Sequence, residues 1–204
     1  MITTDRKAVF LLENGFCEKE YIELQPILTD MSISSRIISS GDGMLTAWNK
    51  LDQPQDSYWG QKYASDYKLG GIASNQFDIL VIPGGRRSAE KLKLNKDVKS
   101  FISGFMASGK PVLIFNLAHD VLVYLGLLQT YHIANYAPDI KSTADARIAG
   151  CHDRDVVKSK NLISLAGYDH DPQILQAYIT AILDGDLSDF NSPPASMDGT
   201  NKAA

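Results

Sequence analysis

Cysteine and long apolar runs are scarce in this 204-residue sequence, and positive charge is in slight deficit. The 2 cysteines, Cys17 and Cys151, are too few for a disulfide framework in a chain of this length, so we expect thiols. No apolar run approaches the ~20 residues of a membrane-spanning helix. No apolar signal segment precedes the first expected strand either. We therefore expect a cytoplasmic protein with no membrane partner.

The charge balance also restricts the classes of partner. Lys and Arg total 20 against 24 Asp and Glu, which gives a net charge of −4 at pH 7. A nucleic-acid-binding protein needs a basic face, so we expect no nucleic-acid partner. The composition, 44% hydrophobic and 22% charged, is that of a globular domain with a substantial core.

Short apolar runs alternate with segments of helical spacing along the chain. The runs predict strands, and the spaced segments, with their terminal signals, predict helices. The expected strands lie at 8–12, 35–39, 78–83, 112–115, 132–136, 156–157 and 162–165. The expected helices lie at 18–31, 95–107, 118–125 and 172–184. Residues 40–76, which include both tryptophans, indicate short strands or a hairpin.

This alternation predicts an α/β fold: a three-layer α/β/α sandwich around a mostly parallel sheet. Residues 1–186 form the expected domain, and the polar stretch 187–204 is an expected disordered C-terminal tail. Ligands in such folds bind outside the carboxyl ends of the strands. The candidate loops are therefore 14–20, 84–87, 116–120 and 166–171.

Several stretches resemble the ThiJ/PfpI family. They are DILVIPGG at 78–85, KLKLNKDVKSFISGFMASGKPVLIF at 91–115, NGFCEKE at 14–20 and YWGQKYASDYKL at 58–69. The resemblance covers residues 7–184 and implies the class I glutamine amidotransferase-like, flavodoxin-like fold and a homodimer. Members are described as proteases, chaperones, glyoxalases, deglycases and hydratases, so the fold alone names no substrate.

The family's catalytic residues map onto this chain only in part. Its members use a cysteine at the corner after the strand 112–115, often followed by histidine, and a glutamate from the first loop. The cysteine position is Asn116, the histidine position is Leu117, and the glutamate position is Glu20. The backbone N–H groups of Gly85 and Leu117 stand where the family places an oxyanion hole. An arginine of some members has no counterpart at 165–167.

Asn116 and Glu20 each have two interpretations. Asn tolerates the positive φ of such a corner, but its amide is not a nucleophile. We favour a structural or ligand-orienting role for Asn116 over that of a catalytic hydrogen-bond donor. Glu20 is either an exposed acid in the first turn of a helix or a carboxylate facing the pocket beside Gly84 and Gly85. We favour the second, in which Glu20 acts as a general base or donates a hydrogen bond as the acid.

Other polar residues near the expected strand ends are weaker candidates. Cys17 lies near a helix N-terminus, where a lowered pKa would make it a substitute nucleophile, although a small partly buried filler is the simpler interpretation. Asp169 and His170 would border the pocket as an acid/base pair or a divalent metal site, with Asp171 as a helix cap. We interpret His119 as a surface or dimer-contact histidine in preference to a displaced catalytic base.

Two motif-like stretches carry little weight. Cys151, His152 and Asp153 are too few and too local to predict a metal site. The stretch 104–110 matches a phosphate-binding loop, but Pro111 replaces the Ser or Thr that binds magnesium, and the segment runs from helix to strand.

Two functional hypotheses from different classes follow. The first, which we favour, is a member without catalysis that binds a small-molecule metabolite or a protein partner at the strand-end pocket. The second is a hydrolase, lyase or glyoxalase-like enzyme that uses Glu20 with water, or a thiol such as Cys17, with oxyanion stabilisation at Gly85 and Leu117. Neither hypothesis requires a cofactor or a metal ion.

Overall fold

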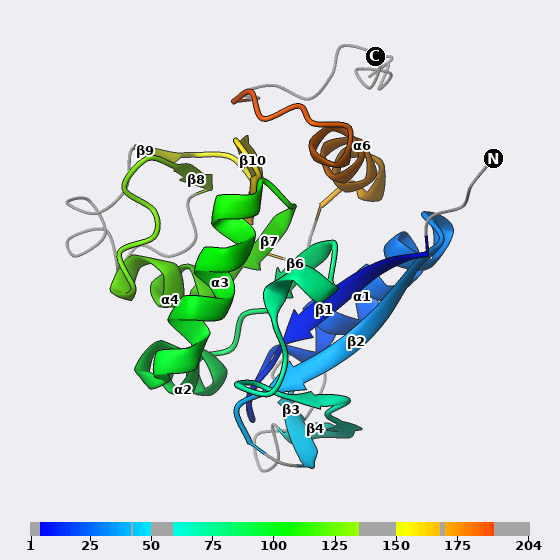
Figure 1. Ribbon diagram of the computed structural model, residues 1–204, viewed down its shortest axis with the longest axis vertical. Coiled ribbons are helices and arrows are strands. Elements are labelled where there is room, and N and C mark those ends of the chain that lie inside the picture. Colours follow the sequence, from blue (N-terminus) through cyan, green and yellow to red (C-terminus); the bar gives the residue numbers. More distant parts are fainter. Residues whose placement is uncertain (1–4, 42, 50–58, 135–149, 168–169, 190–204) are drawn as a thin grey trace, which may run out of the picture.

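The computed structural model describes residues 5–41, 43–49, 59–134, 150–167 and 170–189, and Figure 1 shows its ribbon. The strands are β1 (Arg6–Leu11), β2 (Ile33–Ser39), β3 (Met44–Trp48), β4 (Trp59–Ala64), β5 (Tyr67–Lys68), β6 (Ile79–Ile82), β7 (Val112–Phe115), β8 (His132–Ala134), β9 (Gly150–His152), β10 (Val156–Ser159) and β11 (Leu162–Leu165). The α-helices are α1 (Glu18–Asp30), α2 (Arg86–Leu94), α3 (Lys96–Ser108), α4 (His119–Tyr124) and α6 (Pro172–Leu183). Short 3-10 turns occur at η1 (Ser74–Gln76) and η2 (Asn116–Ala118).

The central sheet has the order β10-β11-β7-β6-β1-β2-β5. Its neighbours pair in parallel except for β10 and β11, which are antiparallel. Strand β2 lies on one side of β1, with the short β5 beyond it, and β6, β7 and β11 follow on the other side of β1. This is the flavodoxin-like order, in which the ligand crevice opens where the order reverses. Here that point lies between the carboxyl ends of β1 and β6.

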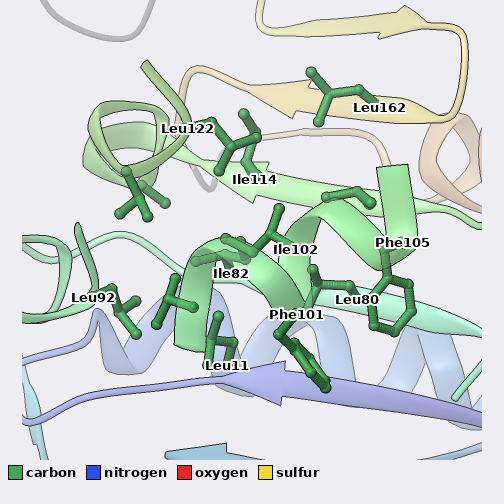
Figure 2. Close-up of a cluster of buried hydrophobic side chains, with 14 of the residues drawn as sticks. Leu11, Leu80, Ile82, Leu92, Phe101, Ile102, Phe105, Ile114, Leu122 and Leu162 are labelled. Carbon is green, nitrogen blue, oxygen red and sulfur yellow. The ribbon is translucent and has the colours of Figure 1, made fainter. Parts of the chain in front are cut away.

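The strand side chains alternate between two apolar cores, one on each face of the sheet. On one face, Leu80 and Ile114 pack with residues of α2, α3 and α4, the cluster that Figure 2 shows. On the other face, Val81 and Leu113 pack with residues of α1 and α6. Figure 1 shows the same division, with the sheet between the two sets of helices. The predicted three-layer sandwich with a mostly parallel sheet is therefore confirmed.

The segment 40–76 contains the expected hairpin, which lies next to the first loop. Strands β3 and β4 form a separate antiparallel pair. The loop after β1 is tied to this hairpin, since Gly15 N–H donates to Thr46 O at 2.8 Å and Trp48 N–H donates to Phe16 O at 2.7 Å. The hairpin thus fixes the segment that leads into α1.

Helix ends follow the signals in the sequence. Asp171 caps α6 by accepting a hydrogen bond from Gln173 N–H, and Pro172 begins the helix. Gly109 ends α3 with a φ of 73°, so the stretch at 104–110 is a helix end and no phosphate loop. The sequence did not predict α2, whose buried face contains only Ser88, Ala89 and Leu92. Among the described residues, no helix has both the length and the apolar character needed to cross a bilayer.

The first residues of the expected C-terminal tail contact the domain. Lys158 Nζ donates to Ser188 O at 2.6 Å, and Asp189 Oδ1 accepts a hydrogen bond from Ser159 Oγ at 2.8 Å. Packing therefore extends through Asp189, beyond the boundary expected at 186. Residues 190–204, and the part of the expected strand beyond Ala134, lie outside the described residues.

Gly85 allows the first loop to lie against the start of α2. Its φ is 108° and its ψ 114°, a conformation that a residue with a side chain rarely adopts. A Cβ atom on Gly85 would lie 2.3 Å from Gly15 O and 2.9 Å from Phe16 Cα, so backbone leaves no room for it. Both constraints require glycine at this strand end.

We expect Gly85→Ala to lower the free energy of unfolding by roughly 3 kcal/mol or more, because backbone strain and a steric clash add at one site. Gly41→Ala is the matched control, since a Cβ there meets nothing within 4 Å. The control should change the stability by less than about 1 kcal/mol. Urea unfolding of both variants measures this, and equal stabilities would contradict the close approach described for Gly85.

Candidate functional site at the carboxyl edge of the sheet

Three elements that are distant in the sequence converge on Gly84, at the end of β6. Glu20 comes from the first turn of α1, and Phe115 and Asn116 from the end of β7. A Cβ atom on Gly84 would lie 3.0 Å from Glu20 Oε2, 3.1 Å from Phe115 O and 3.3 Å from Asn116 Cβ. Gly84 O also accepts a hydrogen bond from Cys17 N–H at 2.9 Å. The structure therefore brings together the first, second and third of the four candidate loops.

Glu20 is a buried carboxylate in this cluster. Its side chain is 2% exposed, and Oε2 accepts a hydrogen bond from Gly84 N–H at 2.5 Å. Burial raises the pKa of Glu20 to about 7, although hydrogen bonds from Gly84 N–H and from the Cys17 thiol oppose the rise. The alternative of an exposed first-turn acid is wrong, because the helix start is covered by the strand ends.

Asn116 occupies the corner with a positive φ of 43°. Asn is among the residues that tolerate this left-handed region, so the corner keeps its backbone with modest strain. The Asn116 side chain is half-buried, and its Cβ atom borders the space that a side chain on Gly84 would occupy. A primary amide in this position offers a donor and an acceptor to a ligand, but no nucleophile.

His119 supports the corner from inside the protein, so the expectation of a surface or dimer-contact histidine is wrong. The residue is 0% exposed. Its Nδ1 lies 2.5 Å from Asn116 O, and its Nε2 lies 2.5 Å from Ser164 Oγ. Asn116 O can only accept, so Nδ1 carries the ring proton and donates to it. The unprotonated Nε2 then accepts from the Ser164 hydroxyl, whose oxygen accepts from Ala134 N–H at 2.7 Å. We therefore assign the neutral tautomer with a proton on Nδ1, and burial lowers the pKa of His119 to about 4.

Cys17 does not have the lowered pKa that its place before α1 suggested. Burial, and the nearby carboxyl of Glu20, raise the pKa of the Cys17 thiol to about 12. A thiol in this state is neither a good nucleophile nor a metal ligand at neutral pH. The side chain is half-buried, which agrees with the simpler interpretation of Cys17 as a filler between the first loop and Gly84.

The oxyanion role of Gly85 and Leu117 stays a prediction. Gly85 precedes α2, and Leu117 lies half-buried in the turn η2. Strands β6 and β7 are neighbours, with Ile82 paired to Ile114, so the two residues follow adjacent strand ends.

The fourth candidate loop borders a groove of about 710 Å³ at the ends of β10 and β11. His170, Arg154 and Tyr178 are among the residues that line it. The His170 ring lies 6.0 Å from the ring of Phe115, the residue that precedes the corner. The groove is therefore next to the strand that carries Asn116. Asp169, its expected partner in an acid/base pair, lies outside the described residues.

Two acidic residues that sequence reasoning missed support the site. Glu18 is 4% exposed and accepts hydrogen bonds from Gln61 N–H at 2.8 Å and from the Tyr63 hydroxyl at 3.0 Å. Glu13 is also 4% exposed, and its Oε1 accepts from Ser40 N–H at 2.8 Å. Both join the first loop and α1 to β2 and the hairpin. In the sequence they resemble ordinary acids beside a turn, so no signal distinguishes them.

Arg87 joins α2 to the same hairpin. Its guanidinium lies 4.9 Å from the centre of the Trp59 ring and 5.3 Å from that of Trp48, within the range of cation–π contacts. Pairing of these tryptophans across β3 and β4 thus fixes the start of the helix that follows Gly85.

Comparisons with known proteins agree with this architecture. Residues 6–181 match the DJ-1/PfpI family. The chain is 28% identical over 160 residues to a protein of Pyrococcus horikoshii named as a deglycase, covering 78% of this chain and 88% of that one. It is 35% identical over 92 residues to protein DJ-1 homolog D of Arabidopsis thaliana, which covers 44% of this chain and 24% of that longer protein.

Solved structures show the same fold. DJ-1beta of Drosophila melanogaster superposes with a TM-score of 0.69 at 20% identity, covering 90% of this chain and 91% of that chain. A two-domain protein of Anabaena variabilis with DJ-1/ThiJ/PfpI-like and ferritin-like domains gives a TM-score of 0.75 at 20% identity, covering 97% of this chain and 52% of that one. The chain belongs to the DJ-1/PfpI family, and the resemblance seen in its sequence is confirmed.

The raised pKa of Glu20 predicts a specific pH dependence of stability. Because the folded-state pKa lies above the unfolded value, the stability that Glu20 contributes is present below the unfolded pKa and is lost as the pH rises through about 7. Glu20→Gln keeps an oxygen acceptor for Gly84 N–H but does not ionise. We expect the unfolding free energy of the native protein, relative to this variant, to fall by roughly 2 to 3 kcal/mol between pH 5 and pH 8.

Urea unfolding at a series of pH values measures this difference. Asp30→Asn is the control, because Asp30 lies exposed at the other end of the same helix. The control should retain the pH dependence of the native protein. Parallel stability curves for the native protein and Glu20→Gln would show that Glu20 is not desolvated.

Proposed function

We propose that this chain binds a small polar metabolite at the carboxyl edge of its sheet without forming a covalent bond to it. The observation that carries the proposal is Asn116, which occupies the corner at a φ of 43° with an amide side chain. An amide holds a ligand by hydrogen bonds and cannot attack it. The other parts of the corner are present, since Glu20 accepts a hydrogen bond from Gly84 N–H beside Asn116.

The state of the nearby thiol supports this proposal. With a pKa of about 12, Cys17 stays protonated at neutral pH and hydrogen-bonds to Glu20. A nucleophilic step needs the thiolate, which is a very small fraction of the residue under these conditions. Cys17 therefore does not replace the missing corner cysteine.

The polar groups at the corner suit a ligand with carbonyl or hydroxyl groups. Glu20, with a pKa of about 7, exists near neutral pH as a mixture of acid and carboxylate. It can accordingly donate or accept a hydrogen bond, and the Asn116 amide can do the same. The groove of about 710 Å³ beside His170 lies next to this corner and is of the size of metabolite pockets, although Glu20, Gly84 and Asn116 are not among its lining residues. A deglycase among the relatives makes small carbonyl compounds the first ligands to examine.

A second candidate function is hydrolysis or isomerisation of such a compound, with Glu20 as the general base toward water. The observation that favours it is the same pKa of about 7, because a general base acts best when its pKa lies near the working pH. This route needs no thiol at Asn116.

Turnover of methylglyoxal and of simple amide and ester substrates distinguishes the two functions. We expect no turnover by the native protein above the rate in buffer, and a gain of activity in Asn116→Cys, which restores a thiol to the corner. Asn116→Ala is the matched control and should remain inactive. The second function would be established, and binding without catalysis contradicted, if the native protein turned over a substrate and Glu20→Gln did not. The native rate should then rise with pH through about 7.

A further inference from the structure

Two histidines face one another on β8 and β9, which form a parallel pair of their own beside β10 (Figure 1). His132 Nδ1 lies 3.1 Å from His152 Nε2, and the ring centres are 5.1 Å apart. Both side chains are half-buried. The corner site uses neither residue.

The separation of the two nitrogens suits an N–H···N hydrogen bond between the rings, and it also suits two ligands of one metal ion that replaces the shared proton. At metal–nitrogen bonds of 2.0–2.1 Å, two ligands lie about 3.3 Å apart in a tetrahedral site and about 2.9 Å apart at a right angle. The observed 3.1 Å lies between these values. Metal binding needs a lone pair on each facing nitrogen, which leaves the proton of each neutral ring on His132 Nε2 and His152 Nδ1.

Gly150 leaves space for the pair. In the register of the two strands, His132 is opposite Gly150, and His152 is opposite Ala134. A Cβ atom on Gly150 would lie 2.6 Å from His132 Nδ1 and 3.6 Å from His152 Nε2. The two facing nitrogens therefore both border the space above Gly150, which any larger residue would fill.

The backbone of β8 is fixed in place by the central sheet. His132 N–H donates to Ser159 Oγ on β10 at 3.1 Å, and Ala134 N–H donates to Ser164 Oγ on β11 at 2.7 Å. Strand β8 thus lies between β9 and the central sheet, and the pairing with β8 positions His152. A ligand pair that is positioned before the metal arrives loses little conformational entropy on binding it.

We propose that His132 and His152 form a binding site for a divalent transition-metal ion of the kind that imidazole prefers, namely zinc, nickel or copper. Within the described residues, no group of three or more His, Cys, Asp or Glu side chains is placed to hold a metal ion. This site is independent of the proposed function, since it shares no residue with the corner.

Metal titration of untagged protein tests this site. Calorimetry with nickel and zinc chloride, in a buffer that does not chelate metals, should show one ion bound per chain. His132→Asn and His152→Asn should each weaken metal binding by roughly tenfold or more. Loss of a residue that only hydrogen-bonds to a metal ligand already lowers metal affinity ~10–100-fold, and these substitutions remove a ligand itself. Gly150→Ala should weaken it similarly although both ligands remain, because its Cβ enters the space between them.

Cys151→Ser is the matched control, because Cys151 is an exposed thiol on the same strand. It should bind as the native protein does. Copper bound to this control should show two nitrogen ligands by electron paramagnetic resonance, a readout that does not depend on how well the histidine variants fold. The proposal would be overturned if the native protein bound no metal, if Cys151→Ser lost binding, or if both histidine variants bound as the native protein does. A copper spectrum without two nitrogen ligands would also overturn it.

Discussion

The hydrogen bond from Gly84 N–H to the buried carboxylate of Glu20 is the interaction on which this edge of the protein depends. It joins the first turn of α1 to the end of β6, at the point where the strand order reverses. Gly84 has no side chain, so Glu20 and the start of η2 approach it from two directions. The same approach removes Glu20 from water, which raises its pKa and makes its proton available near neutral pH.

Much of the fold could be predicted because the parallel strands are short continuous apolar runs. Residues 79–82 and 112–115 are buried on both faces, and only such a sequence suits the centre of a covered sheet. The helix α2 was not predicted, because its sequence is mostly polar and only three of its side chains are buried. A helix of 9 residues with so few apolar side chains gives only a short pattern, so its tertiary contacts decide its structure.

The position of the candidate site could be predicted from the sequence, but the burial and the pKa values of its side chains could not. Family resemblance placed Glu20 and Asn116 at the corner, and the topology brings them to Gly84. The burial of His119 depends on Ser164, which lies 45 residues away in the sequence on a different strand, so no local pattern reveals it. The favoured interpretation of Cys17 as a filler agrees with its raised pKa: a helix N-terminus favours the thiolate, but burial beside a carboxyl group opposes it and has the larger effect.

The central claim is that Glu20 is desolvated against Gly84 and titrates near neutral pH. Carbon-13 NMR of protein labelled at the glutamate side-chain carboxyl carbons measures this directly, with the signal of Glu20 assigned by its loss in the Glu20→Gln variant. A desolvated Glu20 should give a titration midpoint of about 7 for that signal. A midpoint of about 4.3, the value of a hydrated glutamate, would show that the carboxylate is exposed to water and that burial against Gly84 does not raise its pKa.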